Sequence, residues 1–168
     1  MKNKIILLIT VLSLLTKLTY SQDKMLVGLS ATLQSSQFGI MVPMWLAKRF
    51  VIAPSFETKF VEKVGADISI GLVPRFYLND EQLSPYFGLK IGTIINIPSS
   101  NNEIDTDKKF DFIGGLAFGA EYFFNDNFSM GVEAQGNFTK SDKNSNRFGN
   151  PDGINFNTAT MIIATIYF

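Results

Sequence analysis

The fold is decided by residues 109–138, which read KFDFIGGLAFGAEYFFNDNFSMGVEAQGNF. The stretch divides at Asn125-Asp126-Asn127, a cluster of turn-forming residues, into two arms of alternating side chains. A period of two over such long arms predicts two antiparallel strands joined by a tight turn. Strands in globular proteins usually run about 5–6 residues. Arms about twice that length suit a sheet that crosses something thick.

The two faces of this hairpin differ in chemistry. One parity is apolar and aromatic, and it includes Phe118 and Val132. The other parity is small, polar or charged, and it includes Asp111, Glu121 and Glu133. A closed sheet with the apolar parity outside would place Val132 against lipid and Glu133 in the lumen.

The same alternation recurs along the chain and predicts eight strands, although the first two alternate poorly. In the last strand, Met161 and Ile163 are apolar exceptions on the polar face. The expected strands are Met25–Leu33, Phe38–Leu46, Phe50–Glu62, Gly65–Leu78, Ser84–Ile97, Lys109–Phe123, Phe128–Thr139 and Ile154–Phe168.

The connections between these strands differ at the two ends of the sheet. Ala47–Arg49, Asn79–Leu83 and Asn125–Asn127 are short, whereas Pro98–Lys108 and Lys140–Gly153 are longer and polar. Short periplasmic turns with longer outer loops are typical of bacterial transmembrane barrels. Proline cannot donate to a strand ladder, which suits Pro98 to the start of a loop.

Prolines inside the expected strands weigh against a regular sheet. Pro54 and Pro74 would be close neighbours across a turn, and one local bulge is expected to accommodate both. The pattern gives no comparable explanation of Pro43, which lies inside the second expected strand.

Strand length and the position of aromatic residues agree with a membrane. About 11 residues of tilted strand rise about 26 Å, close to the apolar band of such barrels. Aromatic residues also gather near the strand ends, as two interfacial girdles would require. We expect one girdle at the short-turn end, made of Trp45, Phe50, Phe76, Tyr77, Tyr86, Phe87, Tyr122, Phe123, Phe124, Phe128, Tyr167 and Phe168, and the other made of Phe38, Phe60, Phe110, Phe112, Phe138 and Phe156.

The first residues have the organisation of a secretory signal. Lys2 and Lys4 precede an apolar segment, Ile5–Leu15, that is too short to span a bilayer. We therefore expect a signal peptide at residues 1–21, cleaved after Ser21, and a barrel domain at residues 22–168. Cleavage would remove three lysines and leave 12 basic against 15 acidic residues, a formal charge of −3 that does not favour nucleic-acid binding.

Three stretches resemble sequences of the OmpA/OmpX-type small outer-membrane β-barrel family. They are the aromatic carboxyl terminus Ile166-Tyr167-Phe168, Pro85-Tyr86-Phe87-Gly88 and Gly119-Ala120-Glu121-Tyr122-Phe123. The resemblance covers residues 22–168 and implies an all-β, eight-stranded, antiparallel, up-and-down, porin-like transmembrane barrel. It also implies a monomer in the bacterial outer membrane. Tyr167 and Phe168 would then form the terminal signal read by the barrel-assembly machinery.

The inward parity gathers charges of both signs: Glu57, Lys59, Asp67, Arg75, Lys90, Asp111, Glu121 and Glu133. The lumen of an eight-stranded barrel holds little beyond side chains, and buried charges must pair. We therefore expect a structural plug. A proton or small-solute path is the functional alternative.

Enzymatic chemistry is poorly provided for. The sequence has no histidine and no cysteine, which excludes Ser-His-Asp and Cys-His nucleophiles and the common His/Cys metal sites. Asp142, Asn144 and Asn146 imitate the start of a calcium loop, but Arg147 and Gly153 stand where glycine and glutamate are required. No catalytic residue, metal or cofactor is expected.

These observations predict a non-enzymatic barrel, surrounded by outer-membrane lipid, with a structural or surface-interaction role. Its outer loops would meet a surface ligand, and the residues available for contact are Asn101, Asn102, Asp105, Asp142, Asn144 and Arg147. Two alternatives remain: a narrow channel for small solutes, and a soluble lipocalin-like barrel that encloses an apolar ligand.

Overall fold

A computed structural model describes residues 26–35, 37–61, 65–98, 108–145 and 149–168. The expected signal peptide lies outside these residues. Nine strands are found within them: β1 (Gly28–Gln34), β2 (Gln37–Met41), β3 (Met44–Ala47), β4 (Phe50–Val61), β5 (Gly65–Tyr77), β6 (Leu83–Pro98), β7 (Lys109–Asn125), β8 (Phe128–Lys140) and β9 (Ile154–Tyr167). Within the same residues, no helix is long and apolar enough to cross a membrane.

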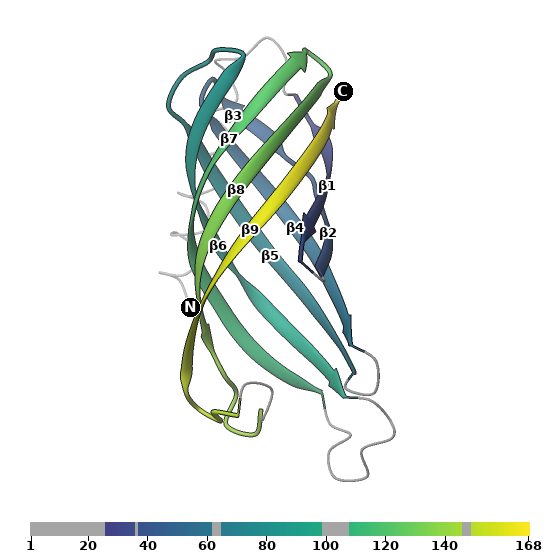
Figure 1. Cartoon of the computed structure of the whole chain (residues 1–168), viewed down its shortest axis with the longest axis vertical. Helices are drawn as coiled ribbons and strands as arrows, with labels where there is room; N and C mark the ends of the chain where they lie inside the picture. The colour runs from purple at the N-terminus through teal and green to yellow at the C-terminus, as the bar shows by residue number, and fades with distance from the viewer. Residues whose placement is uncertain (1–25, 36, 62–64, 99–107, 146–148) are drawn as a thin grey trace, which may run out of the picture.

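The strands form one closed antiparallel sheet (Figure 1). The order is β2-β1-β9-β8-β7-β6-β5-β4-β3, and β2 also pairs with β4. Because β2 and β3 follow one another along β4, they act as a single interrupted strand of the wall. The expected eight-stranded antiparallel barrel is therefore confirmed.

Pro43 explains the interruption between β2 and β3. Val42 and Pro43 separate the two strands, but both remain tied to the wall. The backbone N–H of Val42 donates to the carbonyl of Pro54 at 3.0 Å, and the N–H of Gly28 donates to the carbonyl of Pro43 at 2.8 Å. The sheet thus stays closed where a continuous ladder would require the donor that proline lacks.

The bulge expected at Pro54 and Pro74 is wrong. The pairing of β4 with β5 keeps one register from Phe50–Phe76 to Val61–Gly65. Along a strand, backbone groups point alternately to the two neighbours. The position of the N–H that Pro54 lacks thus faces the interruption between β2 and β3. The position of the N–H that Pro74 lacks faces β6, at a gap in the β5–β6 pairing, and beyond the gap the two strands pair in the same register as before it.

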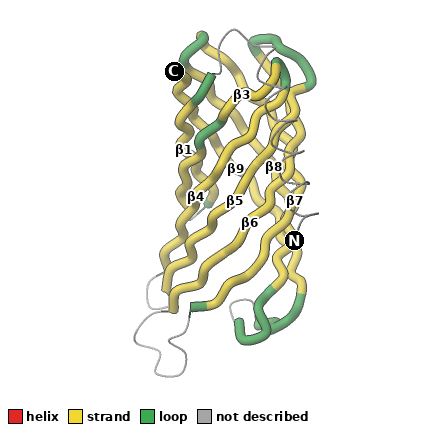
Figure 2. The backbone as a smooth tube through the Cα atoms, turned by 180° about the vertical axis from the view of Figure 1, so that it is seen from behind, coloured by secondary structure: helices red, strands yellow, loops and turns green. Residues whose placement is uncertain are grey.

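The two ends of the barrel differ. The turns at residues 48–49, 78–82 and 126–127 lie together with the carboxyl terminus, at the top of Figure 1, and we call this the short-turn end. The opposite long-loop end carries the β8–β9 connection (Figure 2). The expectation that Pro98 starts a loop is wrong. Pro98 is the last residue of β6 and pairs with Gly65.

The outer surface of the barrel is apolar, as the alternation predicted. Val132 is 55% exposed on the outside, whereas its neighbour Glu133 is 0% exposed inside. Six phenylalanines expected at the long-loop girdle are all exposed: Phe38, Phe60, Phe110, Phe112, Phe138 and Phe156.

The wall is staggered at the long-loop end, because the β1–β2 hairpin is short. Strand β1 pairs with β9 only from Ile162 to Tyr167. The first half of β9, Ile154–Met161, pairs with β8 on one side and with no strand that the structure describes on the other. The N–H of Phe168 donates to the carbonyl of Val27, on the side of β1. Because backbone groups alternate along a strand, the N–H and carbonyl groups of the even-numbered residues in Ile154–Met161 face this same side, where no described strand pairs with them.

Candidate functional site

Five aromatic side chains close the lumen at the short-turn end. We call Trp45, Tyr77, Tyr86, Phe123 and Tyr167 the aromatic layer. The ring of Trp45 stacks on Tyr77 with centroids 4.8 Å apart, and Tyr77 is 5.1 Å from Tyr86. Phe123 and Tyr167 complete the layer, with centroids 6.1 Å apart. Such offset and tilted arrangements are the favourable geometries for aromatic pairs.

This layer corrects the expected short-turn girdle. Its five residues point into the lumen rather than toward lipid, although Phe76, Phe87, Tyr122, Phe124 and Phe168 of the same expected girdle are exposed. Sequence interpretation missed the layer because it grouped aromatic residues by distance from the strand end. Strand parity distinguishes the inward aromatic residues from the outward ones. Tyr77 shares the inward parity of Arg75, whereas Phe76 does not.

A charged layer lies directly against the aromatic rings. The Arg75 guanidinium forms an ion pair with Glu133 at 3.0 Å, and it lies 4.9 Å from the ring centroid of Tyr86. Tyr86 donates its hydroxyl to Glu133 at 2.8 Å. Three hydroxyls hold Glu121: those of Tyr77 and Ser129, and that of Tyr167 at 3.0 Å.

These contacts satisfy carboxylates that burial would otherwise strongly destabilise. Glu121 and Glu133 are 2% and 0% exposed, and a buried charge without partners is very costly. The two amides of β8 extend the arrangement: Asn137 donates to Gln135 at 3.1 Å, and Gln135 donates to Glu133 at 2.6 Å. The tyrosine hydroxyls therefore couple the aromatic layer to the charged layer.

Gly119 shows how tightly this region is packed. A Cβ atom at this position would lie 2.6 Å from the Tyr86 hydroxyl and 2.7 Å from the carbonyl oxygen of Val132. The backbone of β7 must approach the tyrosine this closely for the ring to fit inside. Gly119 therefore makes room for its bulky neighbour Tyr86.

An apolar layer follows toward the long-loop end. It consists of Met41, Ala53, Val73, Met161 and Ile163, all buried. Met161 and Ile163, the exceptions to alternation in the sequence, are therefore lumen residues that pack against β2, β4 and β5. The lumen is not lined by charges alone.

A polar chamber of about 180 Å³ lies nearer the long-loop end. The Lys90 ammonium binds both carboxylate oxygens of Glu57 at 2.6 Å, and Gln37 also donates to this carboxylate. Asp67 accepts from Asn96 at 2.7 Å. Lys59 and Asp67 line the chamber and are half-buried rather than sealed.

Asp111 organises the β8–β9 connection. It accepts hydrogen bonds from the backbone N–H of Asp142 at 2.9 Å and from the Ser145 hydroxyl at 3.3 Å. Ser141 and Ser145 are buried. Part of this polar connection, within residues 140–145, thus packs against the lumen. We call these contacts of Asp111 the loop latch.

The remaining expected contact residues divide into two groups. Asn144 is exposed, and its N–H donates to the Asp142 carboxylate at 2.8 Å. Asn101, Asn102, Asp105 and Arg147 lie outside the residues that the structure describes.

The two terminal residues have different surroundings. Tyr167 belongs to the aromatic layer, and the Asn127 side chain donates to its carbonyl at 3.0 Å. Phe168 is 74% exposed, and its N–H donates to Val27 at 2.9 Å. Only Phe168 therefore offers an accessible ring at this end of the chain.

Among the described residues, no group of three or more acidic, histidine or cysteine side chains is placed to hold a metal ion. Glu121 and Glu133 face tyrosine, serine, arginine and amide donors in the closed lumen.

Comparisons with known proteins agree with this architecture. A family model described as outer membrane protein beta-barrel domain matches residues 20–161. The N-terminal β-barrel domain of Pseudomonas aeruginosa OprF is similar in structure, with a TM-score of 0.64 and 12% identity, over 88% of this chain and 98% of that one. Neisserial surface protein A is similar with a TM-score of 0.56 and 12% identity, over 85% and 92% of the two chains. A search of curated proteins found no match.

Proposed function

The chain belongs to the outer membrane protein β-barrel domain family, and from that membership we propose that it is a non-enzymatic, monomeric barrel whose role is a surface interaction. The interaction is made at the long-loop end. The unpaired half of β9 is the observation that carries this proposal.

Strand length supports an extension of the wall beyond the membrane. A transmembrane β-strand needs about 9–11 residues. Strand β7 has 17 residues and β9 has 14. Within the hydrocarbon region, backbone groups at an open sheet edge find no partner, and lipid-exposed edges do not occur there. Ile154–Met161 therefore stands beyond the hydrocarbon or pairs with another polypeptide segment.

The composition of this half favours strand addition. Natural sheets protect exposed edges with proline, lysine or bulges. Ile154–Met161 reads INFNTATM and has none of the three. Its even-numbered N–H and carbonyl groups suit an extended partner chain, which would add a strand to the sheet. The latched β8–β9 connection, with Asn144 exposed, adjoins this edge.

To test the proposal, cells that lack the gene are complemented with the wild-type gene or with genes for variants at Thr158. Thr158→Pro removes one edge N–H that is not used in the described sheet, and Thr158→Val keeps it. We expect wild type and Thr158→Val to restore adhesion to serum-coated surfaces and survival in serum, and Thr158→Pro to restore neither. Equal restoration by all three, or no difference between cells with and without the protein, contradicts the proposal.

The packed lumen weighs against the channel alternative. Between the short-turn end and the chamber, the aromatic, charged and apolar layers fill the lumen with packed side chains, and its polar groups Glu133, Gln135 and Asn137 are hydrogen-bonded to one another. In planar bilayers we expect the purified protein to give no large, steady conductance. A large and reproducible conductance would favour transport instead.

The lipocalin-like alternative receives no support from the side-chain arrangement. Large apolar residues cover the outside, among them Leu116, Phe118 and Ile162.

On the same proposal, the chain is exported with loss of residues 1–21, and Phe168 is presented with Tyr167 to the assembly machinery. We expect the mature chain in outer-membrane fractions, with gel mobility that changes on boiling. Recovery in the soluble periplasmic fraction would contradict membrane insertion.

A further inference from the structure

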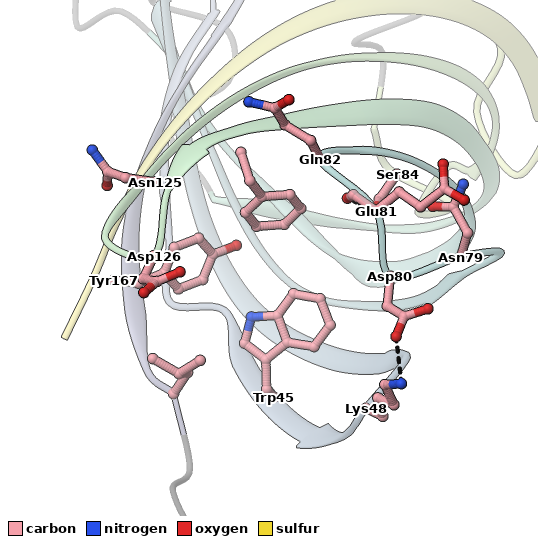
Figure 3. Close-up of a pocket in the computed structure, with 12 residues that line it drawn as sticks. Trp45, Lys48, Asn79, Asp80, Glu81, Gln82, Ser84, Asn125, Asp126 and Tyr167 are labelled. Atoms are coloured by element: carbon pink, nitrogen blue, oxygen red, sulfur yellow. Dashed lines mark hydrogen bonds and ion pairs between the residues drawn. The ribbon is translucent and has the colours of Figure 1, made fainter.

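A cavity of about 500 Å³ opens at the short-turn end (Figure 3). The aromatic layer lies between this cavity and the rest of the lumen. We call it the short-turn cavity. Trp45 from β3, Phe123 from β7 and Tyr167 from β9 form its aromatic floor. The turns after β5 and β7 form its rim. Its volume falls in the range of small-molecule sites, about 300–1,000 Å³.

The rim of the cavity is acidic. It carries Asp80, Glu81 and Asp126 against a single cation, Lys48. Lys48 forms an ion pair with Asp80, as Figure 3 shows, and Arg49 binds the same carboxylate at 3.2 Å. The hydrogen bonds from Lys48 and Arg49 hold the pKa of Asp80 below its ordinary value. At neutral pH the Asp80 carboxylate is therefore charged and bound to Lys48 and Arg49.

The other two rim carboxylates are available. Within the residues that the structure describes, neither Glu81 nor Asp126 forms an ion pair, and both are exposed. The formal charge of the lining residues is −2 when Lys48 is counted, and −1 when Arg49, which binds Asp80, is counted as well. Carboxylates above an aromatic floor attract a cation, because ring faces carry negative electrostatic potential. Anionic ligands are repelled by the same charges.

We propose that the short-turn cavity binds a small organic cation, namely an ammonium group that carries an aromatic or alkyl body. The body packs on Trp45, Phe123 and Tyr167, and the ammonium group lies toward Glu81 and Asp126. This site is independent of the interaction at the long-loop end, because the packed lumen separates the two.

The chain contains its own reporter, since Trp45 is its one tryptophan. Purified full-length protein in a nonionic detergent at low salt is titrated with benzyltrimethylammonium while Trp45 fluorescence is recorded. We expect a saturable change. Tetramethylammonium, which lacks the aromatic body, should require higher concentrations, and benzenesulfonate should give no saturable change.

Two variants separate binding at this site from general partitioning into detergent. Glu81→Gln combined with Asp126→Asn should weaken benzyltrimethylammonium binding about 3- to 10-fold, the effect of removing two surface charges. Phe123→Leu should weaken it about 2- to 5-fold, the effect of losing one exposed cation–π contact. Asp152→Asn, an acidic residue at the long-loop end, is the matched control and should leave binding unchanged.

All variants should keep the mobility difference before and after boiling that marks a folded barrel. A linear, non-saturable fluorescence response overturns the proposal. So does equal binding of benzenesulfonate, or the same affinity in the Glu81→Gln/Asp126→Asn variant and the wild type. Higher salt should weaken the specific binding, because exposed charges are screened.

Discussion

The two halves of the lumen are built differently. Toward the short-turn end, rings in mutual contact cover a charged layer whose donors are mostly tyrosine hydroxyls and Arg75. Toward the long-loop end, a polar chamber holds the Lys90–Glu57 pair, and the loop latch lies beside it. Packed side chains fill the first half, whereas the second half contains a cavity with room for water.

This difference has an energetic consequence for the charges in each half. A buried charge that loses its partner in a dry region keeps the full desolvation cost. A polar cavity with room for ordered water can satisfy part of the lost hydrogen bonding. Equivalent substitutions in the two halves should therefore have different costs.

The largest effect is expected at Arg75. Arg75→Met leaves Glu133 buried without a cation, and breaking such a pair costs about 3–5 kcal/mol. Urea unfolding in lipid vesicles measures the loss. The double variant Arg75→Met/Glu133→Gln should recover part of it, because the charge left unpaired is removed as well. A double variant less stable than Arg75→Met would show that this pairing is not what stabilises the layer.

The matching substitution in the chamber is Lys90→Met. Glu57 keeps a hydrogen bond from Gln37 and borders the cavity of about 180 Å³. We expect a loss of about 1–3 kcal/mol, the cost of a buried acceptor with a missing partner. The same vesicle assay tests this. If Lys90→Met costs as much as Arg75→Met, the two halves of the lumen do not differ in hydration.

The loop latch should show a smaller and more local effect. Asp111→Ala removes the acceptor for Asp142 and Ser145, at a cost of about 1 kcal/mol, the typical net contribution of a hydrogen bond. Limited trypsin digestion of intact vesicles should then cut more rapidly at Lys143. Ser129→Ala, which removes a donor in the short-turn half, is the control and should not change cleavage there. Unchanged cleavage in Asp111→Ala would mean that the loop is held by other contacts.

Alternation along single strands was enough to predict the wall and the facing of its residues. Val132 and Glu133 could be assigned to opposite faces because strand geometry allows no other arrangement for neighbours. The position of Tyr77 and Tyr86 was open to the same argument. Their assignment to a girdle was wrong because nearness to the strand end was given more weight than parity.

Other features depend on contacts between distant segments. Asp111 and Ser145 lie 34 positions apart, and nothing local in either segment signals their hydrogen bond. Likewise, Pro54 fits without a bulge only because Val42–Pro43 interrupts the neighbouring strand. The apolar layer is assembled from β2, β4, β5 and β9, so Met161 was visible in the sequence only as an exception. Such arrangements follow from the register of the closed sheet.

The smallest effect is expected at the exposed rim, where Asp80 binds Lys48 and Arg49. These cations lower the pKa of Asp80 in the folded protein, chiefly through the hydrogen bond from Lys48. A lowered folded pKa contributes stability above the unfolded value, about 3.9, and this contribution is lost as pH falls through the folded value. Wild type should therefore unfold at slightly more urea than Asp80→Asn at pH 7, and the difference should shrink below about pH 4. Added salt should reduce the difference at pH 7, since exposed pairs are screened, whereas the effect of Arg75→Met should change little. A difference between wild type and Asp80→Asn that grows in acid would contradict the assigned pairing of Asp80. Equal salt sensitivity of the rim and the charged layer would contradict the contrast in burial between them.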